Sequence, residues 1–277
     1  MHTELWRRRP LHLASFVPVA LAVALAGCGD DSGDDGSGFG PAQTEGLPTH
    51  EAVRTTLQAV VAEGAAGNGG LGLHMWATVV DRSGIVTAVV FSGPGVGDQW
   101  LLSRVISAQK AATANGLSLN SLALSTANLW AATQPGGSLY GLQESNPVDH
   151  DEAYAGDVST FGTTSDPMTD KRIGGVNVFG GGLALYNSAG EKIGAIGVSG
   201  DTSCADHNIA WKLRDGLALD FVPAGVADGG TTDNIIYDIG ADQVSESGFG
   251  HQDCSTLATQ IGQQLPVSHP ISSAPGP

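Results

Sequence analysis

Basic residues are scarce in this sequence. Lys and Arg together number 12 against 28 Asp and Glu, so the formal net charge is −16. Aromatic residues make up 6% of the chain, and no stretch interleaves them with basic residues. Because an acidic surface repels phosphate backbones, we expect no nucleic-acid partner.

The sequence also lacks a long hydrophobic run at its N-terminus. The apolar stretch from Leu11 to Ala26 is shorter than the roughly 20 residues that a membrane span needs. It follows three arginines, at 7–9, and ends in "LAGC", which is typical of a bacterial lipoprotein signal. We therefore expect residues 1–27 to be a cleaved signal peptide rather than an uncleaved anchor, and Cys28 to carry lipid.

This signal predicts a location in the bacterial cell envelope, with the membrane as a partner through the lipid anchor. Gly29, which follows the lipidated cysteine, carries no strong inner-membrane retention signal. We expect an outer-membrane or periplasmic location.

Cysteine is rare as well, with three in the chain. If Cys28 carries lipid, Cys204 and Cys254 remain and can pair in an oxidising compartment. The alternative is a nucleophilic Cys204 with His207 as its base, which the same compartment disfavours. We predict a Cys204–Cys254 disulfide.

Composition divides the rest of the chain. Residues 28–46 are Gly, Ser and Asp with little to bury, which indicates a disordered tether. We expect one domain over residues 47–220, interrupted by a polar insertion at 141–172. Residues 221–277 form a C-terminal extension with one apolar run, "NIIYDI", and a Pro- and Ser-rich end that is expected to fray.

Hydrophobic spacing predicts an α+β fold. Apolar residues at helical spacing indicate helices over residues 48–63, 101–114, 121–133 and 205–219. Apolar runs indicate strands at "MWATVVD" (75–81), "IVTAVVF" (85–91), "VNVF" (176–179), "GLALYN" (182–187) and "KIGAIGVSG" (192–200). The short links "RSG" and "SAG" predict hairpins, hence a mainly antiparallel sheet covered by helices.

Motifs for catalysis or phosphate binding are missing. The glycines of "GGVNVFGGG" and "GVSG" lack both the G-x-G-x-x-G spacing and a Walker lysine. "GVSG" also lacks the fifth position of a nucleophile elbow. These glycines are better explained by tight turns and close packing.

Several motifs resemble one family in its order. "VVDRSGIV", "SAQKAATA", "IGGVNVFGGGLALY" and "KIGAIGVSG" are similar to the GlcG/HbpS-like proteins, also called DUF336. The resemblance implies a profilin-like α/β/α sandwich with a five-stranded antiparallel sheet, assembly into homo-oligomers, and haem binding in some relatives. Lys110 and Thr113 fall in the family's "KA-x-TA" segment, so they become candidate ligand-binding residues.

The predicted disulfide suggests a second site. It would bring His207 and His251 into one neighbourhood, because each lies three residues from a paired cysteine. Two imidazoles with Asp206 or Asp253 suit a metal ion or a haem iron. The alternative is that these side chains form hydrogen bonds that lock the extension.

Other histidines compete with this pair. His50 lies on the first expected helix and His74 opens the first expected strand. His150 lies in "DHDE", whose oxygens could bind a divalent cation or merely be solvated.

The leading hypothesis is a lipid-anchored extracytoplasmic binding protein for haem, a related tetrapyrrole or a metal. The alternative is a protein–protein interaction or sensory accessory module without a small ligand. A small-molecule enzyme is the third hypothesis, because no catalytic constellation supports it.

Overall fold

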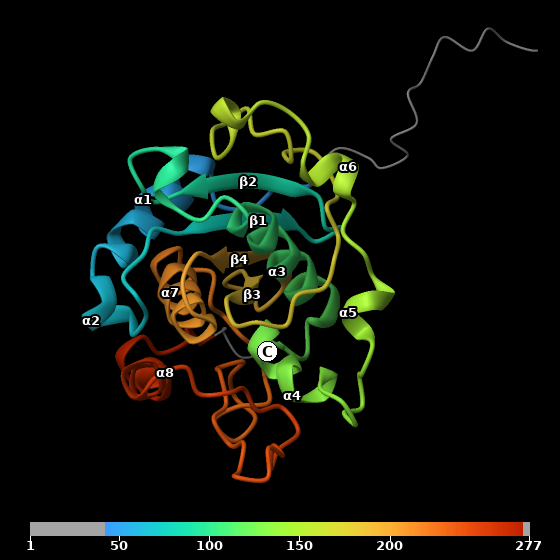
Figure 1. Ribbon diagram of the computed structural model, residues 1–277, viewed down its shortest axis with the longest axis vertical. Helices are drawn as coiled ribbons and strands as arrows, with labels where there is room; N and C mark the ends of the chain where they lie inside the picture. The colour runs from blue at the N-terminus through green and yellow to red at the C-terminus, as the bar shows by residue number, and fades with distance from the viewer. Residues whose placement is uncertain (1–41, 274–277) are drawn as a thin grey trace, which may run out of the picture. The chain divides into compact units, whose positions relative to one another are not determined.

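A four-stranded antiparallel sheet lies at the centre of the structure (Figure 1). The computed structural model describes residues 42–273, so the signal peptide, Cys28 and most of the tether lie outside the described residues. The strands follow the order β2-β1-β4-β3. They are β1 (Trp76–Asp81), β2 (Val86–Phe91), β3 (Gly182–Tyr186) and β4 (Lys192–Ser199).

Both faces of the sheet are covered by helices. All six residues of β1 are buried, and its side chains alternate between two cores. Val79 joins the core formed with helices α1 (His50–Val61) and α7 (Ser203–Gly216). Val80 joins the core formed with helix α3 (Ser103–Leu117) on the opposite face. The result is the expected α/β/α sandwich.

The expectation of a fifth strand is wrong for the described part of the chain. "VNVF" was the additional candidate, but Gly174 and Gly175 before it have φ of 66° and 79°. These left-handed residues turn the backbone out of an extended path. The Asn177 N–H then donates to Thr113 Oγ1 at 3.0 Å, so this segment binds α3 instead of a strand.

The first hairpin owes its turn to Asp81. Its buried carboxylate accepts hydrogen bonds from the backbone N–H of Ser83 at 2.8 Å and of Ile85 at 2.9 Å. It also accepts one from Gln43 N–H at 2.8 Å, which attaches the start of the described chain. The "VVD" motif is therefore a structural turn.

Three of the four predicted helices form within a few residues of their expected bounds, as α1, α3 and α7. The helix predicted over 121–133 is helical only in its second half. Ser125 caps the 3-10 helix η2 (Thr126–Leu129), which runs into α4 (Trp130–Thr133), while Leu119 and Leu122 pair in a β-bridge before it. The remaining short helices are α2 (Gly64–Asn68), η1 (Val96–Asp98), α5 (Leu142–Ser145), α6 (His150–Ala153) and η3 (Val158–Thr160).

The insertion at 141–172 is packed onto the core. Arg104 of α3 donates to both carboxylate oxygens of Asp166, and its Nη1 donates to the Ala153 carbonyl at 2.9 Å. The guanidinium lies 3.7 Å from the centre of the Phe161 ring. Since Arg104 and Asp166 are both buried, this pair fixes the insertion against α3.

The C-terminal extension is attached by a covalent bond and an ion pair. The predicted Cys204–Cys254 disulfide is present, with the two Cα atoms 6.0 Å apart. Arg214 donates to both carboxylate oxygens of the buried Asp233 at 2.7 and 2.8 Å. "NIIYDI" forms no strand; Asn234 and Ile235 are buried and the four residues after them are half-buried.

The extension also contains a helix that the sequence analysis did not predict, α8 (Thr256–Ser268). Ser255 caps it by accepting the Ala258 N–H at 3.1 Å, and Ala258 and Leu265 are buried against the domain. Within residues 42–273, no helix has the length and apolar character needed to cross a membrane.

Candidate functional site

Lys110 and Asp206 form a buried ion pair between α3 and α7. Lys110 Nζ lies 2.7 Å from Asp206 Oδ2 and also donates to the Val198 carbonyl at 3.0 Å. Asp206 Oδ1 accepts the Asp201 N–H at 2.9 Å. Burial raises the pKa of Asp206 to about 6 against the opposing effect of Lys110, and burial lowers the pKa of Lys110.

Gly181, just before β3, packs closely against this ion pair. A Cβ atom at Gly181 would lie 3.2 Å from Lys110 Nζ and 3.1 Å from Asp206 Cβ. Glycine is required there for close approach, and φ is +114°. Lys110 is 1% exposed, so it is shielded from an external ligand.

His207 joins α7 to the extension. Its Nε2 accepts the Ile235 N–H at 3.1 Å and lies 3.2 Å from Asn234 Oδ1. The ring is fully buried, and Nδ1 has no hydrogen-bond partner in the described part of the chain. Burial lowers the pKa of His207 to about 4, so the imidazole is neutral at pH 7.

His251 makes a similar connection from the extension. Its Nδ1 lies 2.7 Å from the Gln252 carbonyl, and its Nε2 lies 2.8 Å from Ser203 Oγ. Ser203 Oγ accepts the Gly180 N–H, which leaves its own proton for the imidazole. His251 is 3% exposed, and burial lowers its pKa to about 4.

The metal set of Asp206, His207 and His251 is not assembled. Within residues 42–273, no group of three or more His, Cys, Asp and Glu side chains is placed to hold a metal ion. Asp206 and His207 are consecutive on α7, so the first faces Lys110 and the second faces Asn234. Asp253, the alternative ligand, is exposed and accepts a hydrogen bond from Thr259.

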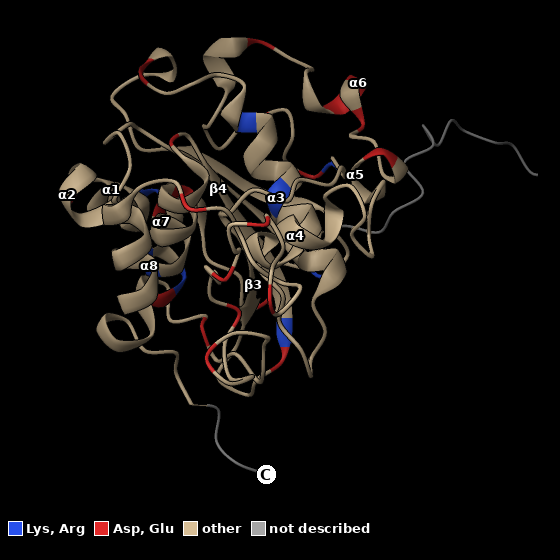
Figure 2. Cartoon of the chain, turned by 60° about the horizontal axis from the view of Figure 1, so that its bottom comes forward, with Lys and Arg blue, Asp and Glu red and all other residues tan. Residues whose placement is uncertain are grey.

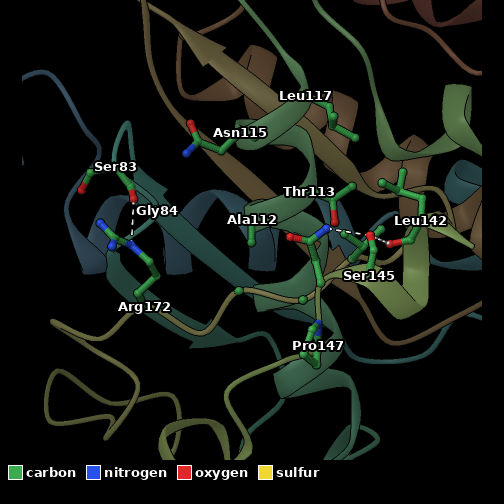
Figure 3. A pocket seen from close by; sticks show the side chains of 15 residues that line it. Ser83, Gly84, Ala112, Thr113, Asn115, Leu117, Leu142, Ser145, Pro147 and Arg172 are labelled. Atoms are coloured by element: carbon green, nitrogen blue, oxygen red, sulfur yellow. Dashed lines mark hydrogen bonds between the residues drawn. The ribbon is translucent and has the colours of Figure 1, made fainter. Parts of the chain in front are cut away.

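Thr113 lies apart from this network, on the wall of a cleft of about 420 Å³ (Figure 3). We call it the α3 cleft. Its walls are the C-terminal half of α3, the turn of the first hairpin, the start of the insertion and the segment after it. The lining residues are Ser83, Gly84, Ala112, Thr113, Asn115, Gly116, Leu117, Leu142, Ser145, Asn146, Pro147, Arg172, Gly174, Gly175 and Val176.

The polar groups of the α3 cleft are held by the backbone around them. Thr113 Oγ1 donates to the Gln109 carbonyl at 2.7 Å and accepts the Asn177 N–H. Asn115 Nδ2 donates to the Arg82 carbonyl, while its Oδ1 is buried without a hydrogen-bond partner in the described residues. At one end, Arg172 Nε donates to the Ser83 carbonyl at 3.0 Å.

The glycine pair at 174–175 forms part of the cleft wall. A Cβ at Gly175 would lie 2.9 Å from Gln109 Cγ, so glycine lets this segment pass close to α3. Beyond it, Val176 and Leu117 offer half-buried apolar surface. The cleft can therefore hold an apolar ligand that carries a few polar groups.

The motifs that build this helix and cleft are those of a known family. The family model for the haem-degrading protein HbpS-like matches residues 49–214. The chain belongs to the HbpS-like family. No curated protein matches the chain.

Among solved structures, the HbpS-like chain is similar to protein ORFY of Klebsiella pneumoniae, a DUF336 protein. The two are 26% identical over 62% of this chain and 90% of ORFY, with a TM-score of 0.41. The PduOC–haem complex is 24% identical over 59% of this chain and 91% of PduOC, with a TM-score of 0.39. A double mutant of Streptomyces reticuli HbpS is 18% identical over 71% and 97%, with a TM-score of 0.36.

The remaining histidines of this HbpS-like chain have separate positions. His50 Nε2 lies 3.0 Å from the Gly162 carbonyl, and His74 Nδ1 lies 3.2 Å from Ser92 Oγ. His150 is exposed on α6, where Asp149 caps the helix by accepting the Glu152 N–H. "DHDE" thus forms a helix start.

Sequence reasoning missed most of the α3 cleft. Thr113 was expected from the helix motif, but Asn115, Leu142 and Arg172 were not. Their only sequence signals are the glycine pair at 174–175 and the position of the insertion, neither of which specifies contact with the end of α3.

Proposed function

We propose that this protein is a lipid-anchored extracytoplasmic protein that binds haem or a related tetrapyrrole in the α3 cleft. The family supports the ligand: its model is described as haem-degrading, and PduOC was solved as a haem complex. The α3 cleft is the single observation that carries the location, because it places Thr113 of the helix motif on the wall of a ligand-sized cavity.

The cleft walls offer apolar surface to a tetrapyrrole ring. Leu117, Leu142 and Val176 are half-buried and gain about 25 cal/mol for each Å² of apolar surface that a ligand covers. Arg172 lies at the hairpin end of the same cleft, where its Nε donates to the Ser83 carbonyl. Asn115 Oδ1 has no described donor, but it is buried beneath the cleft surface. When bound, haem would supply a redox-active iron.

His207 and His251 are the competing location for an iron or another metal ion. Both rings are buried and hydrogen-bonded, so a ligand reaches them only if the extension opens. This proposal therefore requires a conformational change, whereas the α3 cleft is open as it stands.

The location is tested with two glycines. Gly116 lines the cleft, and a Cβ there has no atom within 4 Å. We expect Gly116→Trp to fill the cleft and weaken haem binding at least tenfold in an absorbance titration. Gly97, in η1, has equally open surroundings but does not line the cleft, so Gly97→Trp is the matched control and should bind as the parent does.

The same titration includes the double change His207→Ala and His251→Ala. If the folded double variant loses haem and Gly116→Trp keeps it, the ligand binds at the histidines and the cleft proposal is wrong. If Gly116→Trp and the double histidine variant both bind haem as tightly as the parent does, haem binds elsewhere on the protein.

The lipid anchor at Cys28 is tested by labelling cells with a radioactive fatty acid. We expect the parent chain to take up the label and to stay in the membrane fraction, and Cys28→Ala to do neither. Label retained by Cys28→Ala would contradict the anchor.

A second function, docking of a protein, is favoured by one observation. Trp100, Leu101 and Leu102 are consecutive and 49 to 59% exposed at the start of α3, the end opposite the cleft. Such contiguous apolar surface often marks an interface. We propose a second copy of this chain as the occupant, and expect light scattering to report an oligomer that Trp100→Ser with Leu102→Ser dissociates. A monomeric parent would exclude it.

A further inference from the structure

Lys212 lies where α7 contacts α2, and the two helices are side by side in the molecule (Figure 2). Lys and Arg occupy few positions in this chain, and this lysine is 6% exposed. Its Nζ lies 2.5 Å from Glu63 Oε2, 3.2 Å from Asn68 Oδ1 and 2.8 Å from the Gly67 carbonyl. A buried amine is therefore placed between a carboxylate and a side-chain amide.

The side-chain amide of Asn68 is held with its oxygen towards Lys212. Its Nδ2 donates to the Val60 carbonyl at 2.9 Å, and the residue is 4% exposed. The backbone carbonyl of Asn68 accepts a hydrogen bond from Asn208 Nδ2 at 3.0 Å. Because Cγ is bonded to Oδ1, a small rotation of the lysine side chain brings Nζ onto this carbon. Such preset proximity replaces much of the entropy cost of bringing two reactants together.

Glu63 is placed to act as the base for Lys212. An ammonium is no nucleophile, so a lysine that reacts needs a neighbouring group that takes its proton. The 2.5 Å contact puts Oε2 within reach of that proton. Glycine at 67 leaves room for the carboxylate, because a Cβ there would lie 2.7 Å from Glu63 Oε2. A cavity of about 370 Å³ that borders Gly67 and Lys212 gives a small leaving group a route to solvent.

We propose that the side chains of Lys212 and Asn68 become joined by an amide bond, which makes this contact a site of covalent self-modification. Glu63 accepts a proton from the Lys212 ammonium, and the neutral Nζ attacks Asn68 Cγ. The bond from Cγ to Nδ2 then breaks. Nδ2 leaves with one further proton from the amine as ammonia, which becomes ammonium by taking the proton back from Glu63. The reaction needs no oxidant, reductant or further reactant.

The cross-link would fasten α7 to α2 across 144 residues of sequence. Helix α7 also carries Cys204 in its first turn, so covalent bonds would hold it near both ends. This proposal concerns a different part of the molecule from the α3 cleft and does not depend on haem. The alternative is that Lys212 stays an unreacted ammonium that Glu63 and Asn68 merely bind.

Tandem mass spectrometry of the full chain, reduced and digested with trypsin, distinguishes the two. We expect residues 55–82 and 193–214 in one branched peptide, about 17 Da lighter than the two together because ammonia is lost. Lys212→Arg should abolish this peptide, and Glu63→Gln should lower the linked fraction at least about tenfold. Lys192→Arg is the matched control. Lys192 is also buried, but its Nζ donates to backbone carbonyls, so the branched peptide should remain.

The same spectra contain the results that would overturn the proposal. Two separate peptides of full mass from the parent would exclude the cross-link. Asn68 precedes Gly69, and an Asn–Gly pair can lose the same ammonia by closing a ring onto the backbone. That product would lie on residues 55–82 alone and persist in Lys212→Arg, which would also exclude the cross-link. A Glu63→Gln variant that links as completely as the parent would show that Glu63 is not the base.

Discussion

Mild acid should destabilise this protein through His207 and His251. Both imidazoles have a folded-state pKa of about 4, against 6.5 for an ordinary histidine. A histidine with a lowered folded pKa contributes stability above pH 6.5 that is lost as the pH falls towards 4. Between pH 7 and pH 5, each of the two histidines takes up a proton in the unfolded state but stays neutral in the folded state. This difference lowers the free energy of unfolding by about 2 kcal/mol for each histidine.

Asp206 acts in the opposite direction over the same range. Its folded pKa is about 6, above the ordinary 3.8, so its contribution to stability is lost as the pH rises through 6 and returns on acidification. Between pH 7 and pH 5, protonation of Asp206 in the folded state raises the free energy of unfolding by about 1.4 kcal/mol. The two histidines outweigh it, and the free energy of unfolding should fall by roughly 2 to 3 kcal/mol.

Urea unfolding at pH 7, 6 and 5, at constant ionic strength, measures this change. His251→Gln keeps a hydrogen-bonding group and removes the titration, so the drop from pH 7 to pH 5 should shrink by about 2 kcal/mol. A parent whose stability stays level or rises on acidification would refute the reasoning. So would a His251→Gln variant that keeps the parental pH dependence.

Three further predictions concern packing and cross-linking. Replacing Cys204 and Cys254 by Ser removes the closure of a 50-residue loop and should cost about 4 kcal/mol in urea unfolding, whereas a cost below about 1 kcal/mol would deny the bond a stabilising role. Asp166→Ala leaves Arg104 buried without its carboxylate, so we expect a loss of about 3 to 5 kcal/mol and faster proteolysis within the insertion, and unchanged proteolysis would contradict the packing. Gly181→Ala brings a methyl group against the buried ion pair and should lower the melting temperature, while Gly116→Ala, in open space, should not.

The sequence predicted the sandwich because its signals are local. Hydrophobic spacing identified α1, α3, α7 and both hairpins, and cysteine pairing identified the disulfide. The prediction of a fifth strand was wrong because Gly174 and Gly175, both with positive φ, turn the chain just before it. Helix α8 was missed although Ser255 caps it and Leu257, Ile261 and Leu265 repeat at helical spacing.

The candidate site was predictable only in part. Lys110 and Thr113 stand three residues apart in one motif, yet Lys110 faces Asp206 and Thr113 faces Asn177. Which of the two borders a cavity depends on where the insertion packs, and the buried contact between Arg104 and Asp166 is part of that packing. A pair separated by 62 residues leaves no periodic pattern in the sequence.

Hydrogen–deuterium exchange with and without bound haem tests most directly whether the α3 cleft is the binding site. On addition of haem, we expect slower exchange in residues 112–117, 142–147 and 172–176, which surround the cleft. We expect no change around His207 and His251, whose backbone lies in the buried connection to the extension. Slower exchange confined to residues 203–207, 234–236 and 250–254 would contradict the account and place the ligand at the histidines.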